Sequence, residues 1–412
     1  MTRISAPETD VVVVGGGIGG LANAYALTVA GHSVRLLEQA PEFGEVGAGL
    51  QLAPNATRIL REWGLLDEVV ARGVLPRRLL CRDAVDGTEL THLDLGEDFQ
   101  ARYGAPYVVI HRSDLHDILV QACRRVDVDL HTSAPVDAVD TGDEVATAVT
   151  GERQHTGRVV IAADGLRSTI RSRLSSDEPI GSGYAAYRGA VPVDSLPSLE
   201  ELSLHDVVLY IGPGCHLVQY PLRGGRMFNQ VAVFSSPGYH RGDADWGGPE
   251  ELHQAFEGCC EQVRSSLENL WNDRFWPMYD REPIPRWVDG RIALTGDAAH
   301  PMLQYLAQGA CQAIEDAFNL AGHSQLRRDG TAVDWTGTLT GYEADRTIRT
   351  ARVQTSARVW GDIWHVDGLA RTLRNALFRD RPVDDYRYID WLYGKHAAPT
   401  PPTEQTIAAV MV

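Results

Sequence analysis

The chain has 412 residues, 44% of them hydrophobic, and this predicts a folded protein of two or three lobes with a large core. Its 38 basic and 55 acidic residues give a net charge of −17 at pH 7, which argues against nucleic acid and anionic membranes as partners. No apolar run reaches the roughly 18 residues of a membrane span, and no signal peptide pattern opens the chain, so we expect a cytoplasmic protein without a transmembrane segment. The six cysteines lack metal-ligand spacing, and no metal site is expected.

A glycine-rich turn between a predicted strand and a predicted helix is the most informative local pattern. Four valines at 11–14 lead into the spacing G-x-G-x-x-G, formed by Gly15, Gly17 and Gly20, and a helical pattern follows at 21–29. Gly15 permits the tight turn, Gly17 lets the backbone approach a pyrophosphate, and Gly20 lets the helix pack closely on the strand. The sequence therefore predicts a dinucleotide site at this turn.

Three acidic residues follow predicted strands, at the edge where open α/β sheets bind ligands. Glu38 ends the strand after the glycine turn, about 20 residues on, where an acidic side chain binds ribose hydroxyls. Asp164 opens the sequence D-G-x-x-S-x-x-R after the apolar run 159–163, and Asp297 lies in G-D-A-A-H-P after the run 291–295. Without the other motifs, the N-cap of a helix would be the favoured interpretation of Asp164 or Asp297.

Together these three motifs resemble the group A flavoprotein aromatic hydroxylases, over nearly the whole chain. The resemblance implies a non-covalently bound FAD, with Glu38 on its ADP half, Asp164 along the pyrophosphate and Asp297 on the ribitol. It also implies that Arg112 and Gly309 contact the cofactor. NADH, or alternatively NADPH, is the implied co-substrate together with dioxygen, and without a second glycine fingerprint we expect the nicotinamide to visit the FAD domain transiently. The resemblance further leads us to expect a homodimer.

The hydrophobic patterns predict an α/β fold with an inserted domain. Alternating strands and helices predict a discontinuous, Rossmann-like FAD-binding domain at residues 1–75, 111–180 and 287–320. Short runs separated by Gly and Pro predict an antiparallel β-sheet substrate domain, which acts as a lid, at residues 76–110 and 181–286. A C-terminal helical region is expected at 321–396 and a flexible tail at 397–412.

One strand of the predicted lid carries the candidate catalytic residues. His216, Val218 and Tyr220 share one face of this strand because side chains alternate along it. A histidine in a strand is by default a core residue, and Tyr220 could serve packing alone. Several segments resemble the 3-hydroxybenzoate 6-hydroxylases within the family, which implies that His216 helps to deprotonate a phenol, with Tyr220 as its hydrogen-bonding neighbour. The same resemblance places Gln304 beside the isoalloxazine, where most relatives have proline; the alternative is that Gln304 faces solvent.

The implied activity is hydroxylation of a phenolic aromatic acid such as 3-hydroxybenzoate, para to its hydroxyl, using NADH and O₂ through a C4a-hydroperoxide of the flavin. Deprotonation makes the ring electron-rich, and a histidine can accept the proton near neutral pH without a large pKa perturbation. The same mechanism on an amino-hydroxybenzoate is the main alternative, and a non-catalytic flavin-fold binding protein is another. Arg188 is a candidate for the substrate carboxylate, although a structural ion pair is the better prediction. Tyr107 either lines the pocket or is buried structurally.

Overall fold

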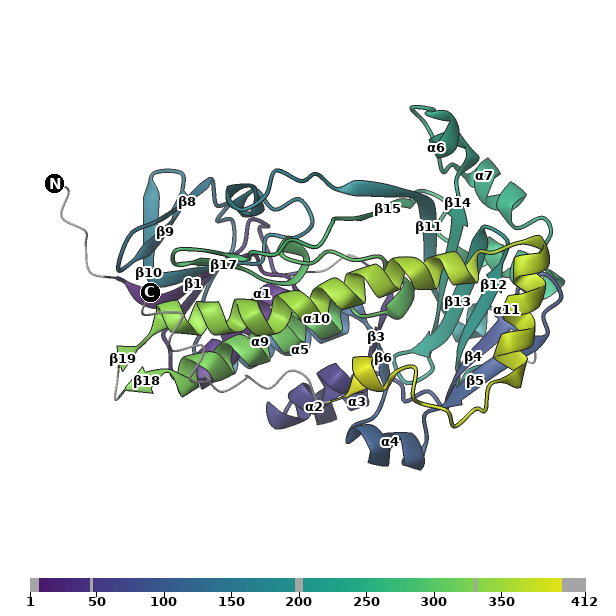
Figure 1. Cartoon of the computed structure of the whole chain (residues 1–412), viewed down its shortest axis with the longest axis horizontal. Coiled ribbons are helices and arrows are strands. Elements are labelled where there is room, and N and C mark those ends of the chain that lie inside the picture. Colours follow the sequence, from purple (N-terminus) through teal and green to yellow (C-terminus); the bar gives the residue numbers. More distant parts are fainter. Residues whose placement is uncertain (1–6, 45–46, 197–202, 330–331, 395–412) are drawn as a thin grey trace.

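Two large sheets, one in each half of the molecule, form the framework of the protein (Figure 1). The computed structural model describes residues 7–44, 47–196, 203–329 and 332–394. The first sheet has eight strands in the order β16-β17-β10-β1-β2-β7, with β9 beside β10 and β8 beside β9. These strands are β1 (Thr9–Val14), β2 (Val34–Leu37), β7 (Asp129–His131), β8 (Ala138–Thr141), β9 (Ala146–Thr150), β10 (Arg153–Ala162), β16 (Val288–Asp289) and β17 (Ile292–Leu294).

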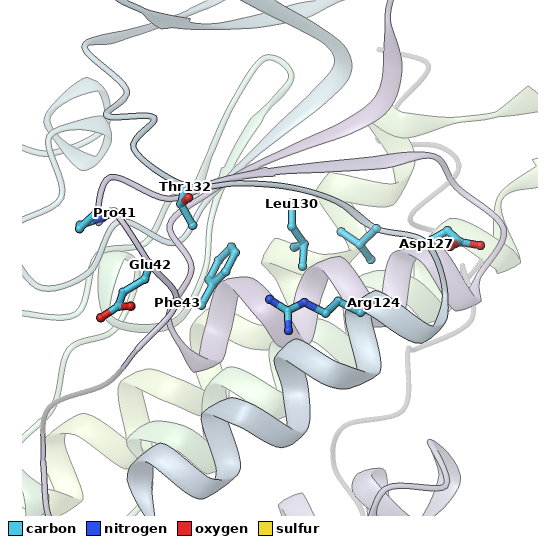
Figure 2. A pocket seen from close by; sticks show the side chains of 8 residues that line it. Pro41, Glu42, Phe43, Arg124, Asp127, Leu130 and Thr132 are labelled. Carbon is cyan, nitrogen blue, oxygen red and sulfur yellow. The ribbon is translucent and has the colours of Figure 1, made fainter.

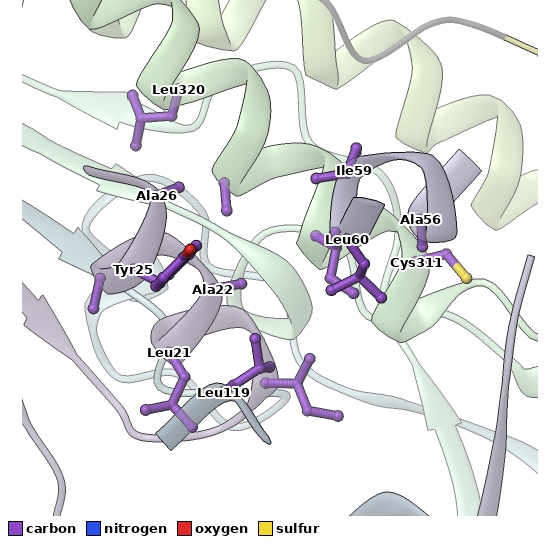
Figure 3. Close-up of a cluster of buried hydrophobic side chains, with 14 of the residues drawn as sticks. Leu21, Ala22, Tyr25, Ala26, Ala56, Ile59, Leu60, Leu119, Cys311 and Leu320 are labelled. Carbon is purple, nitrogen blue, oxygen red and sulfur yellow. The ribbon is translucent and has the colours of Figure 1, made fainter. Parts of the chain in front are cut away.

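The centre of this sheet is parallel, because β1 pairs in parallel with β2 and β10, and β10 pairs in parallel with β17. A parallel strand is covered on both faces, and this explains the unbroken valine run of β1, whose Val11, Val12 and Val13 are fully buried. Helices α1 (Ile18–Val29), α5 (Arg112–Arg125), α9 (Gly309–Leu326) and α2 (Pro54–Glu62) supply much of the apolar core around it. Figure 3 shows part of this core, which includes Leu21, Ala22, Tyr25, Ala26, Ala56, Ile59, Leu60, Leu119, Cys311 and Leu320.

The second sheet has seven strands in the order β15-β11-β14-β13-β12-β4-β5. Its pairs are antiparallel except for β12 with β4, which run parallel. The predicted inserted lid thus corresponds to a sheet built from two separate parts of the chain. The strands are β4 (Arg78–Asp83), β5 (Glu89–Asp94), β11 (Ile180–Pro192), β12 (Val207–Gly212), β13 (Cys215–Leu222), β14 (Met227–Ser235) and β15 (Trp276–Asp280).

The two faces of the seven-stranded sheet have different neighbours. One face packs beneath α7 (Pro249–Ala255) and α8 (Glu261–Ser266), with Leu217 and Phe234 in a common apolar cluster with these helices. The other face, which we call the inner face, packs with Tyr305 and with Trp364, the last residue of α10 (Trp335–Trp364). The inner face thus packs against the segment that follows the sequence G-D-A-A-H-P.

Residues 97–110 differ from the prediction, which assigned the whole of 76–110 to the lid. Residues 97–103 form helix α4 (Glu97–Tyr103), and β6 (Val108–His111) pairs with β3 (Gly49–Leu52) instead of joining the seven-stranded sheet. Val108, Val109 and Ile110 are fully buried in the same core as β1, and this burial explains why the segment returns early to the nucleotide-binding part.

The C-terminal region is mainly helical, as the sequence predicts. α10 runs from beside the eight-stranded sheet to the seven-stranded sheet (Figure 1), and the predicted tail at 397–412 lies outside the described residues. Of the helices described, none has both the length and the apolar character that a membrane span requires. The remaining elements are α3 (Leu66–Arg72), α6 (Pro237–Arg241), α11 (Gly368–Asp380), α12 (Asp390–Tyr393), β18 (Arg328–Asp329) and β19 (Ala332–Val333).

Candidate active site

The glycine turn between β1 and α1 has the backbone geometry that its spacing predicts. Gly15 has a φ of +105°, which side chains rarely tolerate, and a Cβ at this position would collide with the carbonyl oxygen of Ala163. A Cβ on Gly20 would in turn collide with the carbonyl oxygen of Gly15. Gly17 is the N-cap of α1 and provides no side-chain cap, so the first N–H groups of the helix stay available to an anion.

Glu38 lies directly beside this turn. Its Oε2 accepts a hydrogen bond from the backbone N–H of Gly16 at 2.5 Å, and its Oε1 accepts one from the N–H of Ala40 at 2.7 Å. An open depression of about 570 Å³ lies between the loop after β2, the C-terminal end of α5 and the segment around β7 (Figure 2). It is lined by Pro41, Glu42, Phe43, Arg124, Asp127, Val128, Leu130 and Thr132.

Asp164 and Asp297 lie in turns that follow β10 and β17, and their surroundings differ. Asp164 Oδ2 accepts hydrogen bonds from the backbone N–H groups of Thr169 and Ile170, at 3.0 and 3.3 Å, so it also caps the short helix that follows. Its Oδ1 is buried and has no hydrogen-bond partner within the described parts of the chain. Asp297 has an exposed side chain in the turn Gly296–Ala298, where it is open to a ligand.

A buried ion cluster holds the Asp297 turn from behind. Asp316 Oδ2 accepts hydrogen bonds from the N–H of Gly296 at 3.0 Å and from His300 Nε2 at 2.6 Å. Arg346 bridges Asp316 and Glu315 at 2.7 and 2.6 Å, and all three side chains are fully buried. Burial alone would raise the pKa of Glu315, but Arg346 and the neighbouring Arg349 lower it to about 2. These charges therefore fix the turn that presents Asp297.

Arg112 and Gly309 both stand at the first residue of a helix. Arg112 begins α5, and its side chain passes the backbone of Gly47, where a Cβ would lie 3.2 Å from Arg112 Cδ. Gly309 begins α9, and a Cβ there would meet no atom within 4 Å. The contact of Arg112 and Gly309 with a cofactor stays a prediction.

The inner face of the seven-stranded sheet carries three separated polar side chains, those of His216, Arg188 and Tyr220, and aliphatic side chains lie between them. Register places His216 beside Val233, Arg188 beside Val231, and Tyr220 beside Asn229. Apolar side chains between polar ones suit a substrate with an apolar ring and polar substituents. The three cross-strand rows are Ala186, Val233, His216 and Ile211; then Arg188, Val231, Val218 and Leu209; then Ala190, Asn229 and Tyr220.

His216 is buried, with 1% of its surface exposed, and its hydrogen-bond partner differs from the prediction. Its Nδ1 lies 2.8 Å from Nε2 of His365, the residue that follows α10, and the two rings stack with centroids 5.1 Å apart. Tyr220 lies four residues along the strand, about 13 Å away, so the predicted hydrogen bond between His216 and Tyr220 is wrong. Burial, and secondly His365, lower the pKa of His216 well below 6.5, which corrects the expected small perturbation.

Gln304 lies in the turn Gln304–Leu306 after the Asp297 motif and turns toward the sheet. Its Oε1 accepts a long hydrogen bond of 3.4 Å from Arg188 Nη2, and its side chain is half-buried, so it does not simply face solvent. Arg188 has no ion pair with any carboxylate of the described residues, which overturns the predicted structural ion pair. Gln304 thus contacts Arg188. The ring of the neighbouring Tyr305 packs beside the ring of His216, with 5.6 Å between the two centroids.

The two tyrosines are both buried but differ in their surroundings. Tyr220 packs on the backbone of Gly49, whose N–H donates to Asn229 Oδ1 at 2.8 Å, so β3 meets the inner face here. Burial raises the pKa of Tyr220, although nearby Arg188 opposes the shift. Tyr107 lies in the core around β1 and donates to Gln51 Oε1 at 2.6 Å, which favours the buried structural alternative.

Comparison with known proteins identifies the family. The chain matches the family described as FAD binding domain over residues 8–357. It is 39% identical over 391 residues to 3-hydroxybenzoate 6-hydroxylase of Polaromonas naphthalenivorans (strain CJ2), covering 94% of this chain and 96% of the relative. The chain belongs to the FAD-dependent aromatic hydroxylases.

A second relative agrees with this placement, and a solved structure shares the fold. The chain is 38% identical over 392 residues to 3-amino-4-hydroxybenzoate 2-monooxygenase of Streptomyces cremeus, covering 95% of this chain and 96% of that one. The fold also matches Klebsiella pneumoniae HpxO complexed with FAD and uric acid, with a TM-score of 0.81 and 24% identity, over 96% of this chain and 99% of that chain.

The cradle of this hydroxylase fits its FAD. The uncapped N-terminus of α1 suits a pyrophosphate, and the crowded Gly15 and Gly20 keep the turn that presents it tight. The carboxylate of Glu38 lies at this turn, and that of Asp297 is exposed in a separate turn. Sequence reasoning missed His365 because it lies 149 residues from His216 and no local motif marks it. It also undervalued Arg188, whose one signal was a charged residue within an otherwise apolar strand.

Proposed function

We propose that this hydroxylase converts 3-hydroxybenzoate to the product hydroxylated para to the existing hydroxyl group, with NADH and dioxygen as co-substrates. The observation that carries the proposal is His216, a buried histidine on the inner face that keeps one nitrogen for a ligand. The relationship to 3-hydroxybenzoate 6-hydroxylases supports the same substrate class. A homodimer stays a prediction from the family resemblance, and a cytoplasmic location stays a prediction from the sequence pattern.

His216 acts on the phenolic hydroxyl of the substrate. In the tautomer that suits this role, its Nδ1–H donates to His365 Nε2, and its Nε2 accepts from the phenol. Within the described residues, Nε2 of His216 has no other hydrogen bond. Because burial keeps His216 neutral at pH 7, it offers this acceptor over the whole range near neutral pH. It draws the phenolic proton as electron density moves from the oxygen into the ring, and His365 is the positioning residue.

The inner face supplies the dry surroundings that this chemistry requires. Val231, Val233 and Ile211 are buried on it, and these aliphatic side chains offer no hydrogen bond to a water molecule. FAD, when bound, supplies electron transfer from NADH and the activation of dioxygen. Gln304 holds Arg188 at the edge of this surface, and its position after the Asp297 turn suits contact with the substrate from the cofactor side.

A substrate panel tests the proposal. Purified enzyme should oxidise NADH faster with 3-hydroxybenzoate than with 2- or 4-hydroxybenzoate, and chromatography should show the 2,5-dihydroxy product. An equal or larger effect of 3-amino-4-hydroxybenzoate, the substrate named for the Streptomyces relative, would replace 3-hydroxybenzoate as substrate. A panel in which no ligand yields a hydroxylated product would contradict the proposed function.

A further inference from the structure

Arg188 on β11 is a cation without a counter-ion in the part of the chain that the structure describes. Its Nε is completely enclosed and has no hydrogen-bond partner, while the side chain as a whole is only half-buried. The guanidinium lies 5.4 Å from the ring centroid of Trp276, and Nη2 makes only the long contact with Gln304. Most of the donors of this arginine are therefore unused.

Other enclosed arginines of the protein differ from Arg188 because each lies close to a carboxylate. Arg171, Arg281, Arg346 and Arg374 have side chains that are at most 6% exposed, and each has a carboxylate oxygen within 4 Å. This is the usual rule, because a charge withdrawn from water needs an opposite charge. Arg188 departs from the rule in a chain with 17 more acidic than basic residues, where carboxylates are plentiful.

The electrostatic surroundings of Arg188 also leave a place for an anion. Burial lowers the pKa of the Arg188 guanidinium, Tyr220 opposes this shift, and the positive charge of Arg112 adds to it. The neighbours of Arg188 are therefore an aromatic face, an amide oxygen, a neutral phenol and a second cation. A ligand with negative charge would compensate the positive charge of Arg188, whereas a neutral ligand would leave that charge uncompensated.

The spacing of the inner face relates this cation to His216. Arg188 and His216 are two strands and one cross-strand row apart, which corresponds to about 12 Å between their Cα atoms. Both side chains project from the same face, with Val231 and Val233 between them. A single aromatic ring on these valines can therefore reach a histidine with one substituent and a guanidinium with another.

We propose that Arg188 binds the carboxylate of the substrate and so selects aromatic acids over neutral phenols. This inference rests on the proposed function, because it takes His216 as the group that meets the phenol. The planar fork of the guanidinium suits a bidentate carboxylate, and Trp276 supports its plane from one side. Gln304, whose Oε1 contacts Arg188 Nη2, then limits the rotation of the fork.

The test separates the contribution of the carboxylate from that of the hydroxyl with ligands that carry the carboxylate, the hydroxyl or both. Binding of benzoate, 3-hydroxybenzoate and 3-hydroxybenzamide is titrated by the change in flavin absorbance of the holoenzyme. In Arg188→Gln we expect the Kd of both acids to rise about 10- to 100-fold, the usual value of charge-assisted hydrogen bonds, and the Kd of the amide to change less than about threefold. Arg188→Lys should restore part of the loss, since it returns the charge without the fork.

Arg274→Gln is the matched control, because Arg274 lies 5.9 Å from the ring centroid of the same Trp276 but is 52% exposed. It should bind all three ligands as the wild type does. Equal losses for acids and amide in Arg188→Gln, or a loss of FAD itself, would overturn the inference and make Arg188 a structural or cofactor-binding residue. Unchanged acid binding in an enzyme that hydroxylates 3-hydroxybenzoate would refute this inference alone. Arg188-dependent binding of benzoate without any hydroxylated product would refute the proposed function alone.

Discussion

The stacked pair of His216 and His365 should make the folded protein sensitive to acid. Burial, and secondly Arg374, lower the pKa of His365 from 6.5 to about 3, so the folded state resists a proton that the unfolded chain accepts. The stability that neutral His365 contributes is therefore fully present above pH 6.5, and it is lost as the pH falls from 6.5 toward 3. At about pH 5 the gap is about 1.5 pH units, and at 1.36 kcal/mol per unit His365 alone costs about 2 kcal/mol of unfolding free energy.

Replacing His365 with glutamine tests this value, because glutamine keeps an amide beside His216 Nδ1 but does not titrate. Urea unfolding of the holoenzyme should show that the wild type loses about 2 kcal/mol more than His365→Gln between pH 7 and about pH 5. His253→Gln, at an exposed position of α7, should follow the wild type. If the wild type and His365→Gln lose stability in parallel, the buried histidine is not the source of acid sensitivity and the reasoning is refuted.

Three further substitutions test the remaining parts of the site. His216→Ala should keep its FAD but hydroxylate about 10²–10⁴-fold more slowly, and it should release more hydrogen peroxide per NADH oxidised. Tightly coupled turnover near the wild-type rate would instead show that His216 is only a core residue. Gly15→Ala should lose nearly all bound flavin on purification, measured by absorbance, whereas Gly258→Ala, whose Cβ meets nothing within 4 Å, should retain it; full flavin content in Gly15→Ala would contradict the cradle. Arg346→Met removes the charge that Glu315 and Asp316 share, while Arg349 stays beside Glu315 and His300 beside Asp316, and it should lower the unfolding free energy by about 3 kcal/mol. An unchanged urea midpoint would show that Arg346 does not stabilise this cluster.

The cofactor cradle could be predicted because its signals are local. A strand, three spaced glycines and an acid about 20 residues later occur within one stretch of chain, and the structure places Gly15, Gly20 and Glu38 together at one turn. The alternation along β13 likewise predicted that His216 and Tyr220 share a face, since a strand fixes this without knowledge of its neighbours.

The errors have a common physical origin in contacts between distant segments. His365 reaches His216 only because α10 ends beside the inner face, and burial by that contact produced the pKa shift that residue type alone does not reveal. The pairing of β6 with β3 depends on a core formed by several other elements. Arg188 was expected to find an acid because most enclosed arginines do, and only the complete set of its neighbours shows that it does not.

Helix α10 sets the distance between the two halves of the active site. It has 30 residues and is therefore about 45 Å long. Arg346, in the first half of the helix, forms an ion pair with Asp316, which holds the Asp297 turn. His365, directly after the last residue of the helix, is hydrogen-bonded to His216 on the seven-stranded sheet. A movement of the seven-stranded sheet away from the eight-stranded sheet would bend α10 or break the hydrogen bond between His216 and His365. We therefore expect the nicotinamide to gain entry by displacement of the isoalloxazine or of nearby loops, while the separation of the two sheets stays constant through the catalytic cycle.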